Sequence, residues 1–301
     1  MSIFVSRHEI NWEQAPRPKV VGLALGGGAA RGAAHIGVLQ VLEENGIYPN
    51  RIAGTSVGAL VGGLYAAGTS PARLEQIMAS MRWRDLASIN MPSISFSSFS
   101  RAEGSLSFLE GATGLLDLDK MIGWIDSILG GPVDFEHLNI PFVAVATELV
   151  TGAMFALNTG SISPAIRASC SVPGIFTPVT RDGRTLVDGV VSNNLPTSVA
   201  RGMGADYVIA VDLLPSGGAT MLTRKQDRVY VPRNVIDVTM HAIYALIRTT
   251  QHDLMTADCH ITPAIGHIAF SDLGQQSQML AIGRQAAEAA VPQILADLKR
   301  L

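Results

Sequence analysis

The sequence predicts an α/β protein whose central sheet is mainly parallel and covered by helices. Apolar strands alternate with helical segments as far as about residue 212, and glycine-rich turns join the first strands to their helices. The chain has 301 residues, of which 48% are apolar, enough for one large domain or two smaller ones. No internal repeat or domain boundary is visible, so we expect a tail over residues 1–19 and one domain over 20–301.

The first two strand–turn–helix units set this pattern. Lys19–Leu25 is a continuous apolar strand, Gly26–Gly32 is a tight loop, and 33–44 is helical. A second short strand over 51–55 leads directly into a second helix over 57–67. Two such units in succession are typical of a parallel sheet.

The remaining elements follow from the same periodicities. The serine-rich stretch 88–104 has no period and is predicted as a loop, and the part after about 214 is predicted mostly helical. The helix over 118–129 is amphipathic, and its apolar stripe covers either the core or a substrate opening. Strands are predicted over 141–148, 153–157, 184–187 and 207–212, an extended piece over 260–263, and further helices over 71–84, 164–169, 198–202, 241–255 and 275–298.

Composition excludes several function classes. The formal net charge is −3, only 16% of residues are charged, and no basic block occurs, so nucleic acid is not an expected partner. Cys170 and Cys259 lie far apart without a CxxC spacing, which fits a reducing compartment. The first 19 residues lack a signal peptide's apolar region, and the longest apolar stretches are too interrupted to span a membrane, so we expect a cytoplasmic protein. No metal-ligand motif is present, so neither metal nor cofactor is expected.

The segment Gly54-Thr-Ser-Val-Gly58 carries the strongest chemical signal. It matches G-x-S-x-G, in which a serine occupies a strained strand-to-helix turn and flanking glycines let backbones pass closely. The alternative is that Ser56 is only the N-cap of the following helix. The preceding strand and following helix favour a nucleophile.

The loop Gly26–Gly32 offers backbone amides beside a helix N-terminus, as an oxyanion requires. It is not a dinucleotide motif, because the third glycine of G-x-G-x-x-G would fall at Arg31. It is not a Walker loop either, because Ala33 and Ala34 stand where Lys and Ser or Thr are needed. A cradle for an oxyanion or another anion remains.

A nucleophilic serine also needs a base, and the residues alone leave two arrangements open. Asp188 stands where a strand meets a turn, a position at which sheet proteins display functional groups. An ordinary triad is compatible with the chain order as well. Its members would be Ser56, then Asp188 or Asp212, then His241, His252, His260 or His267.

Four blocks in the order of the sequence together resemble the patatin-like phospholipase family, most closely the stand-alone bacterial branch related to the neuropathy-target-esterase catalytic domain. The resemblance extends from about Val20 to Leu213. The blocks are Gly26-Gly-Gly-Ala-Ala-Arg-Gly32, Gly54-Thr-Ser-Val-Gly58, Arg167-Ala-Ser-Cys-Ser-Val-Pro-Gly-Ile-Phe-Thr-Pro-Val179, and Asp188-Gly189 followed by Asn193-Asn-Leu-Pro196.

The resemblance implies a three-layer α/β/α fold and a Ser–Asp dyad without a catalytic histidine. Ser56 would be the nucleophile and Asp188 the base. The chain departs from the family pattern at Val190, where a small residue is usual and added bulk would narrow the site. It also departs in the glycine loop: aligned on Arg31 and Gly32, Ala29 replaces the third glycine, and aligned on Gly26–Gly28, the loop has one extra residue. The implied oxyanion donors are the amides of Gly27, Gly28 and Ala29, and the supporting motif residues are Gly26, Arg31, Gly32, Gly54, Gly58 and Gly189.

The implied activity is hydrolysis of carboxylic esters of phospholipids or lysophospholipids through an acyl-enzyme. Such a substrate implies transient peripheral contact with a membrane, for which the loop 89–99 and the helix 118–129 are candidates. Three alternatives stay open: a lipid- or protein-binding regulatory module without strong catalysis, a triad esterase, and acyl transfer to an acceptor other than water. The oligomeric state is not predicted.

Overall fold

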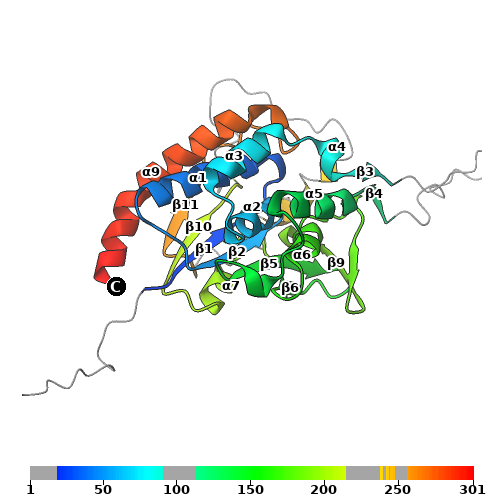
Figure 1. The fold of residues 1–301 in the computed structure, drawn as a ribbon, viewed down its shortest axis with the longest axis horizontal. Coiled ribbons are helices and arrows are strands. Elements are labelled where there is room, and N and C mark those ends of the chain that lie inside the picture. Colours follow the sequence, from blue (N-terminus) through cyan, green and yellow to red (C-terminus); the bar gives the residue numbers. More distant parts are fainter. Residues whose placement is uncertain (1–18, 91–112, 215–237, 240–241, 244, 248–255) are drawn as a thin grey trace, which may run out of the picture.

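The computed structural model confirms the mixed α/β architecture with a mainly parallel central sheet (Figure 1). Helices cover both faces of this sheet, and most of them lie on one face. The structure describes residues 19–90, 113–214, 238–239, 242–243, 245–247 and 256–301.

The main sheet has eight strands in the order β11-β10-β1-β2-β5-β9-β8, with β6 paired to β5 beside this path. The first five strands of this order run parallel, and β6, β8 and β9 are antiparallel additions. Parallel strands covered on both faces are continuously apolar, as the fully buried β1 is. The strands are β1 (Val21–Leu25), β2 (Arg51–Thr55), β5 (Phe142–Glu148), β6 (Met154–Leu157), β8 (Val179–Arg181), β9 (Arg184–Asp188), β10 (Tyr207–Val211) and β11 (Cys259–Ile261).

The two faces of the sheet carry helix layers of unequal size. Leu23 and Leu25 of β1 face the large core beneath α1, α2 and α9, whereas Ala24 faces a small cluster with Ala200 of α7. Figure 1 shows α1 and α9 on one side of the strands and α7 on the other. The helices are α1 (Ala33–Glu44), α2 (Val57–Ala66), α3 (Pro71–Ser80), α4 (Trp83–Leu86), α5 (Asp119–Leu129), α6 (Ile162–Ser169), α7 (Thr197–Gly202) and α9 (Gln276–Arg300).

The carboxyl-terminal helix α9 packs directly against the backbone of α1. A Cβ added to Gly37 would lie 2.1 Å from the carbonyl oxygen of Leu280, and one added to Gly283 would lie 2.1 Å from that of Ala34. Glycine at both positions therefore lets the two helices approach backbone to backbone. This contact fixes α1, and with it the loop that precedes α1.

The structure corrects one predicted helix and adds one sheet that the sequence did not predict. The segment 71–84 is not one helix, because Met81 and Arg82 are extended and separate α3 from α4. A three-stranded sheet of β3 (Ser88–Ile89), β4 (Gly114–Asp117) and β7 (Gly174–Phe176) was not expected, since strands of two to four residues carry no usable periodicity.

The structure places the predicted amphipathic helix 118–129 on the core, whereas several other predicted segments lie largely outside the described residues. The apolar face of α5 packs on the core, where Met121 and Ile125 are buried. Of the predicted helix 241–255 the structure describes residues 242–243 and 245–247, which are helical, and the rest lies outside the described residues. The loop 89–99 lies outside them except for residues 89 and 90, as does the tail before residue 19. Among the helices that the structure describes, none combines the length and the apolarity that a membrane crossing requires.

Candidate active site

Ser56 lies at the single-residue turn between β2 and α2. Its backbone has φ 55° and ψ −124°, a left-handed conformation that costs a residue with a side chain about 1–3 kcal/mol. A Cβ on Gly54 would lie 2.5 Å from the carbonyl oxygen of Gly58, and a Cβ on Gly58 would lie 2.2 Å from that of Leu25. The two glycines therefore permit the close backbone contacts that hold the strained turn.

The register of β5 explains why two residues so far apart in sequence meet. Val145 of β5 pairs in parallel with Thr55, the last residue of β2, and the next residue, Ala146, pairs with Asp188, the last residue of β9. Since β6 pairs with the same stretch of β5, it occupies the other edge, so β2 and β9 share one edge and meet end to end. Ser56, which follows β2, is thereby placed beside Asp188.

The two side chains are in direct contact. Ser56 Oγ donates a hydrogen bond of 2.8 Å to Asp188 Oδ2, and the amide of Val190 donates one of 2.9 Å to Oδ1. Asp188 is completely buried, and this burial raises the pKa of its carboxyl group to about 7, although both hydrogen bonds act in the opposite direction. A carboxylate with a pKa near neutrality can both accept and return a proton under ordinary conditions.

Two serines to which the sequence analysis assigned no role hold these residues in place. The amide of Ser56 donates to Ser169 Oγ over 2.9 Å, and that hydroxyl in turn donates to the carbonyl oxygen of Val145. The amide of Asp188 donates to the carbonyl oxygen of Ser171 over 2.9 Å. Both serines belong to the sequence block 167–179, which was noticed only as a family feature.

The glycine-rich loop lies against the serine, since a Cβ on Gly27 would be 3.3 Å from the Cβ of Ser56. The amide of Gly27 already donates to the carbonyl oxygen of Asn194 over 3.2 Å. The amides of Gly28 and Ala29 have no acceptor within the part of the chain that the structure describes, and Ala29 is held at φ 51°. Of the three predicted oxyanion amides, that of Gly27 is therefore occupied, and those of Gly28 and Ala29 have no acceptor among the described residues.

Arg31 supports the loop from behind. Its buried guanidinium donates to the carbonyl oxygens of Ile268, at 2.7 and 3.0 Å, and of Leu213, at 3.3 Å, and it lies 3.7 Å above the ring of Phe270. Arg31 could either steady the loop or attract a phosphate head group, and these contacts with backbone carbonyl oxygens favour the first role. A Cβ on Gly32 would lie 2.1 Å from Val57 Cγ2, so glycine there lets the loop close onto α2.

Gly26 and Gly189 complete the supporting motif. The amide of Gly26 donates to the carbonyl oxygen of Val211 over 3.0 Å and ties the loop to β10. A Cβ on Gly189 would lie 2.2 Å from the carbonyl oxygen of Val145, so the turn after Asp188 requires glycine. The side chain of Val190 packs in the hydrophobic core.

No histidine in the described ranges contacts the serine or the aspartate. His260 and His267 are exposed on the surface, and His241 and His252 lie outside the described residues. His35 is buried with Nε2 2.8 Å from the carbonyl oxygen of Gly26, and burial lowers its pKa to about 4. Asp212 is buried with a pKa raised to about 6, and its Oδ1 accepts from the amide of Leu214. Ser56 therefore reaches its carboxylate without an intervening imidazole.

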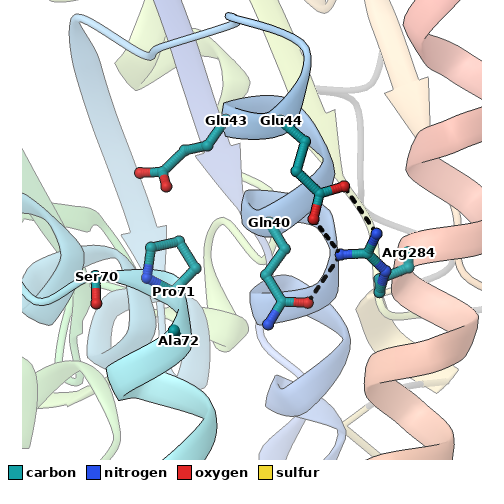
Figure 2. Close-up of a pocket in the computed structure, with 7 residues that line it drawn as sticks. All are labelled: Gln40, Glu43, Glu44, Ser70, Pro71, Ala72 and Arg284. Atoms are coloured by element: carbon teal, nitrogen blue, oxygen red, sulfur yellow. Dashed lines mark hydrogen bonds and ion pairs between the residues drawn. The ribbon is translucent and has the colours of Figure 1, made fainter.

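A groove of about 330 Å³ lies at the other end of α1, where it runs between α1, the start of α3 and α9 (Figure 2). Arg284 spans it and binds Gln40 and both carboxylate oxygens of Glu44. None of the predicted site residues lines this groove. At a helix rise of about 1.5 Å per residue, it lies roughly 16 Å from Gly32 along the axis of α1. Within the described ranges no group of three His, Cys, Asp or Glu side chains is placed to hold a metal ion.

Comparison with known proteins is consistent with this architecture. A family model described as patatin-like phospholipase matches residues 23–201. An uncharacterized NTE family protein of Mycobacterium tuberculosis is 41% identical over 196 residues, which are 64% of this chain and 49% of that protein. Patatin-like phospholipase domain-containing protein 6 of Homo sapiens is 29% identical over 289 residues, which are 89% of this chain and 20% of that protein.

Among solved structures, the crystal structure of VipD from Legionella pneumophila is similar to this fold with a TM-score of 0.49 and 16% identity, covering 90% of this chain and 66% of that one. The alignment with the mycobacterial relatives spans about half of their length. The family model, in contrast, matches more than half of this chain. The chain belongs to the patatin-like phospholipase family.

Proposed function

We propose that the protein hydrolyses carboxylic esters of phospholipids or lysophospholipids through an acyl-enzyme on Ser56. The observation that carries the proposal is the 2.8 Å hydrogen bond from Ser56 Oγ to the fully buried Asp188. A binding module has no need of a nucleophile paired with a base whose pKa is raised to about 7. Membership of the family supports a lipid ester as substrate.

In the first step Ser56 Oγ attacks the carbonyl carbon of the ester and its proton passes to Asp188 Oδ2. The new Oγ–C bond leaves a negative charge on the carbonyl oxygen, which the amides of Gly28 and Ala29 are proposed to bind. When this intermediate collapses, the C–O bond to the alcohol breaks and Asp188 returns the proton to the departing oxygen. The acyl group is then held by Ser56 as an ester.

In the second step water attacks the acyl-enzyme. Asp188 takes a proton from the water, and the Oγ–C bond breaks as the proton moves back to Ser56. The products are a carboxylic acid, an alcohol and the free enzyme. No metal ion is needed for either step, because every proton is moved by Asp188.

The deciding experiment is hydrolysis of a short-chain p-nitrophenyl ester and of a lysophospholipid by wild type, Ser56→Ala and Asp188→Asn, each confirmed as folded. Loss of the nucleophile is expected to lower kcat by about 10³-fold or more, and loss of the base by about 10²- to 10⁴-fold. An inactive wild type would favour the binding module. An active Asp188→Asn would return the late histidines to consideration, and their alanine variants would then be assayed.

We also propose that contact with the membrane rests on apolar surface, because the net charge of −3 gives no general attraction to anionic lipid. The candidate loop 89–99 contains Phe96 and Phe99. Alanine at both positions is expected to reduce sedimentation with liposomes while hydrolysis of a soluble ester persists. Undiminished sedimentation of this double variant would count against the loop.

A further inference from the structure

The buried side-chain carboxamide of Asn194 has no partner within the part of the chain that the structure describes. It is 2% exposed, and neither Oδ1 nor Nδ2 has a hydrogen-bond partner among the described residues. Buried polar groups are nearly always hydrogen-bonded, because an unpaired one loses its bonds to water without replacement. A carboxamide with both ends unpaired therefore requires a partner other than the described residues, such as a bound ligand or an ordered water.

The position of this carboxamide shows where such a partner would be. A Cβ on Gly27 would lie 2.8 Å from Asn194 Oδ1 and 3.3 Å from the Cβ of Ser56. The carboxamide and the serine therefore both border the space that a side chain at Gly27 would fill. Rotation by 180° about χ2 exchanges the carboxamide oxygen and nitrogen, so Nδ2 can face this point as well.

The side chain is not needed to anchor the glycine loop. That contact belongs to the backbone, since the carbonyl oxygen of Asn194 accepts the hydrogen bond from the Gly27 amide. The same bond removes the Gly27 amide from the donors open to an oxyanion. The Gly27 amide is therefore already bonded, and Nδ2 of Asn194, a donor without an acceptor among the described residues, lies close to it.

We propose that Asn194 is a further catalytic residue, whose Nδ2–H donates a hydrogen bond to the oxyanion formed when Ser56 attacks the ester. The inference rests on the proposed function, because it assigns Asn194 to the same acyl transfer. The carboxamide would act with the amides of Gly28 and Ala29, and its Nδ2 would gain a hydrogen-bond acceptor only in the tetrahedral intermediate. A donor that is desolvated beforehand and paired only then stabilises the transition state more than the ground state.

The test combines kinetics with stability in the full chain. Asn194→Leu has a similar size but no donor, and Asn193→Leu is the matched control, because the Asn193 side chain reaches Met154 and Ser198 instead of the loop. For Asn194→Leu we expect kcat for a p-nitrophenyl ester to fall about 10²- to 10³-fold with KM nearly unchanged. The thermal midpoint is expected to be equal or higher, because an unpaired buried polar group has been removed.

A second readout follows the oxyanion site without ester turnover. A fluorophosphonate reacts as Ser56 Oγ forms a bond to phosphorus, fluoride departs and Asp188 takes the proton, and a phosphoryl oxygen stands in for the oxyanion. Phosphonylation of Asn194→Leu is expected to slow by a factor similar to the loss in kcat, while that of Asn193→Leu stays near the wild-type rate. If leucine prevents folding, Asn194→Ala is measured in the same way, with the same losses expected.

The outcomes separate the two proposals. A wild type that is not phosphonylated at Ser56 would overturn the proposed function and this inference with it. A reactive wild type whose Asn194→Leu variant reacts within about threefold of the same rate would overturn this inference alone. A lowered thermal midpoint with unchanged kcat per folded molecule would overturn it too, since the carboxamide would then serve the fold.

Discussion

Replacement of Asp188 by asparagine is expected to stabilise the protein at neutral pH while it removes activity. Asparagine has the shape of aspartate and can keep both hydrogen bonds, because its oxygen can accept from the Val190 amide and its nitrogen can donate to Ser56 Oγ. What changes is the charge, which in the wild type is carried by a completely buried group. The variant therefore isolates the cost of ionising Asp188 inside the protein.

The magnitude follows from the pKa of Asp188, which burial raises from 3.8 to about 7. A displacement of roughly three pH units corresponds to about 4 kcal/mol at about 1.36 kcal/mol per unit. Between these two pKa values the folded protein binds the proton more tightly than the unfolded chain, so wild-type stability falls as pH rises. Below about pH 4 both states are protonated and this cost is absent, whereas above pH 7 it is complete.

Urea denaturation of wild type and Asp188→Asn across pH 4 to 8 measures the effect, since the difference between the two cancels the other titrating groups. The stability gap is expected to be smallest near pH 4 and to grow in favour of the variant up to about 4 kcal/mol by pH 8. Asp212→Asn is the matched control, because Asp212 is also buried but its pKa rises only to about 6. Its gap should level off earlier, at about 3 kcal/mol. A gap for Asp188→Asn that is independent of pH would refute the reasoning.

Three further predictions follow from the same geometry. Because Asp188, the proposed base, must be ionised, kcat/KM of the wild type should rise with pH through a midpoint near its pKa of about 7, which a pH–rate profile measures. Gly283→Ala should destabilise the fold by about 1–3 kcal/mol, because its Cβ would lie 2.1 Å from the Ala34 carbonyl oxygen. Gly123→Ala is the control: its Cβ would meet open space, so it should stabilise the fold by up to about 1 kcal/mol, and thermal unfolding of both variants measures the difference. Arg31→Met should cost about 3 kcal/mol in denaturant unfolding, since buried carbonyl oxygens lose their donors.

The turn at Ser56 was predictable from the sequence because its causes are local. A serine at φ 55° needs neighbours whose backbones can approach closely, and Gly54 and Gly58, each two residues from Ser56, indicate that requirement in the sequence. The parallel sheet was predictable for a similar reason, since strands buried on both faces are continuously apolar. In both cases the residues that determine the structure are neighbours in the sequence, so one sequence is enough to predict it.

Contacts set by the register of distant strands could not be predicted in this way. Ser169 Oγ accepts a hydrogen bond from the amide of Ser56, 113 positions earlier in the sequence, and the carbonyl oxygen of Asn194 accepts one from the amide of Gly27. No pattern in the residues next to either pair predicts these contacts. The three-stranded sheet of β3, β4 and β7 was not predicted, because its strands are too short to show the alternation of apolar and polar residues by which a strand is recognised. The block 167–179 carried a family resemblance, but the sequence did not predict that its serines hold Ser56 and Asp188 in place.

The same limit applies to the chemistry of Asp188. Its position after an apolar strand suggested a functional carboxylate, but an aspartate in water has a pKa of about 3.9 and would be a poor base. The property that makes it useful is its complete burial, which depends on β5 bringing β2 and β9 end to end along one edge. One strand thus determines both the distance between Ser56 and Asp188, the proposed nucleophile and base, and the environment that raises the pKa of Asp188. A change in the register of β9 on β5 would remove both together, because it would move Asp188 away from Ser56 and out of its buried position.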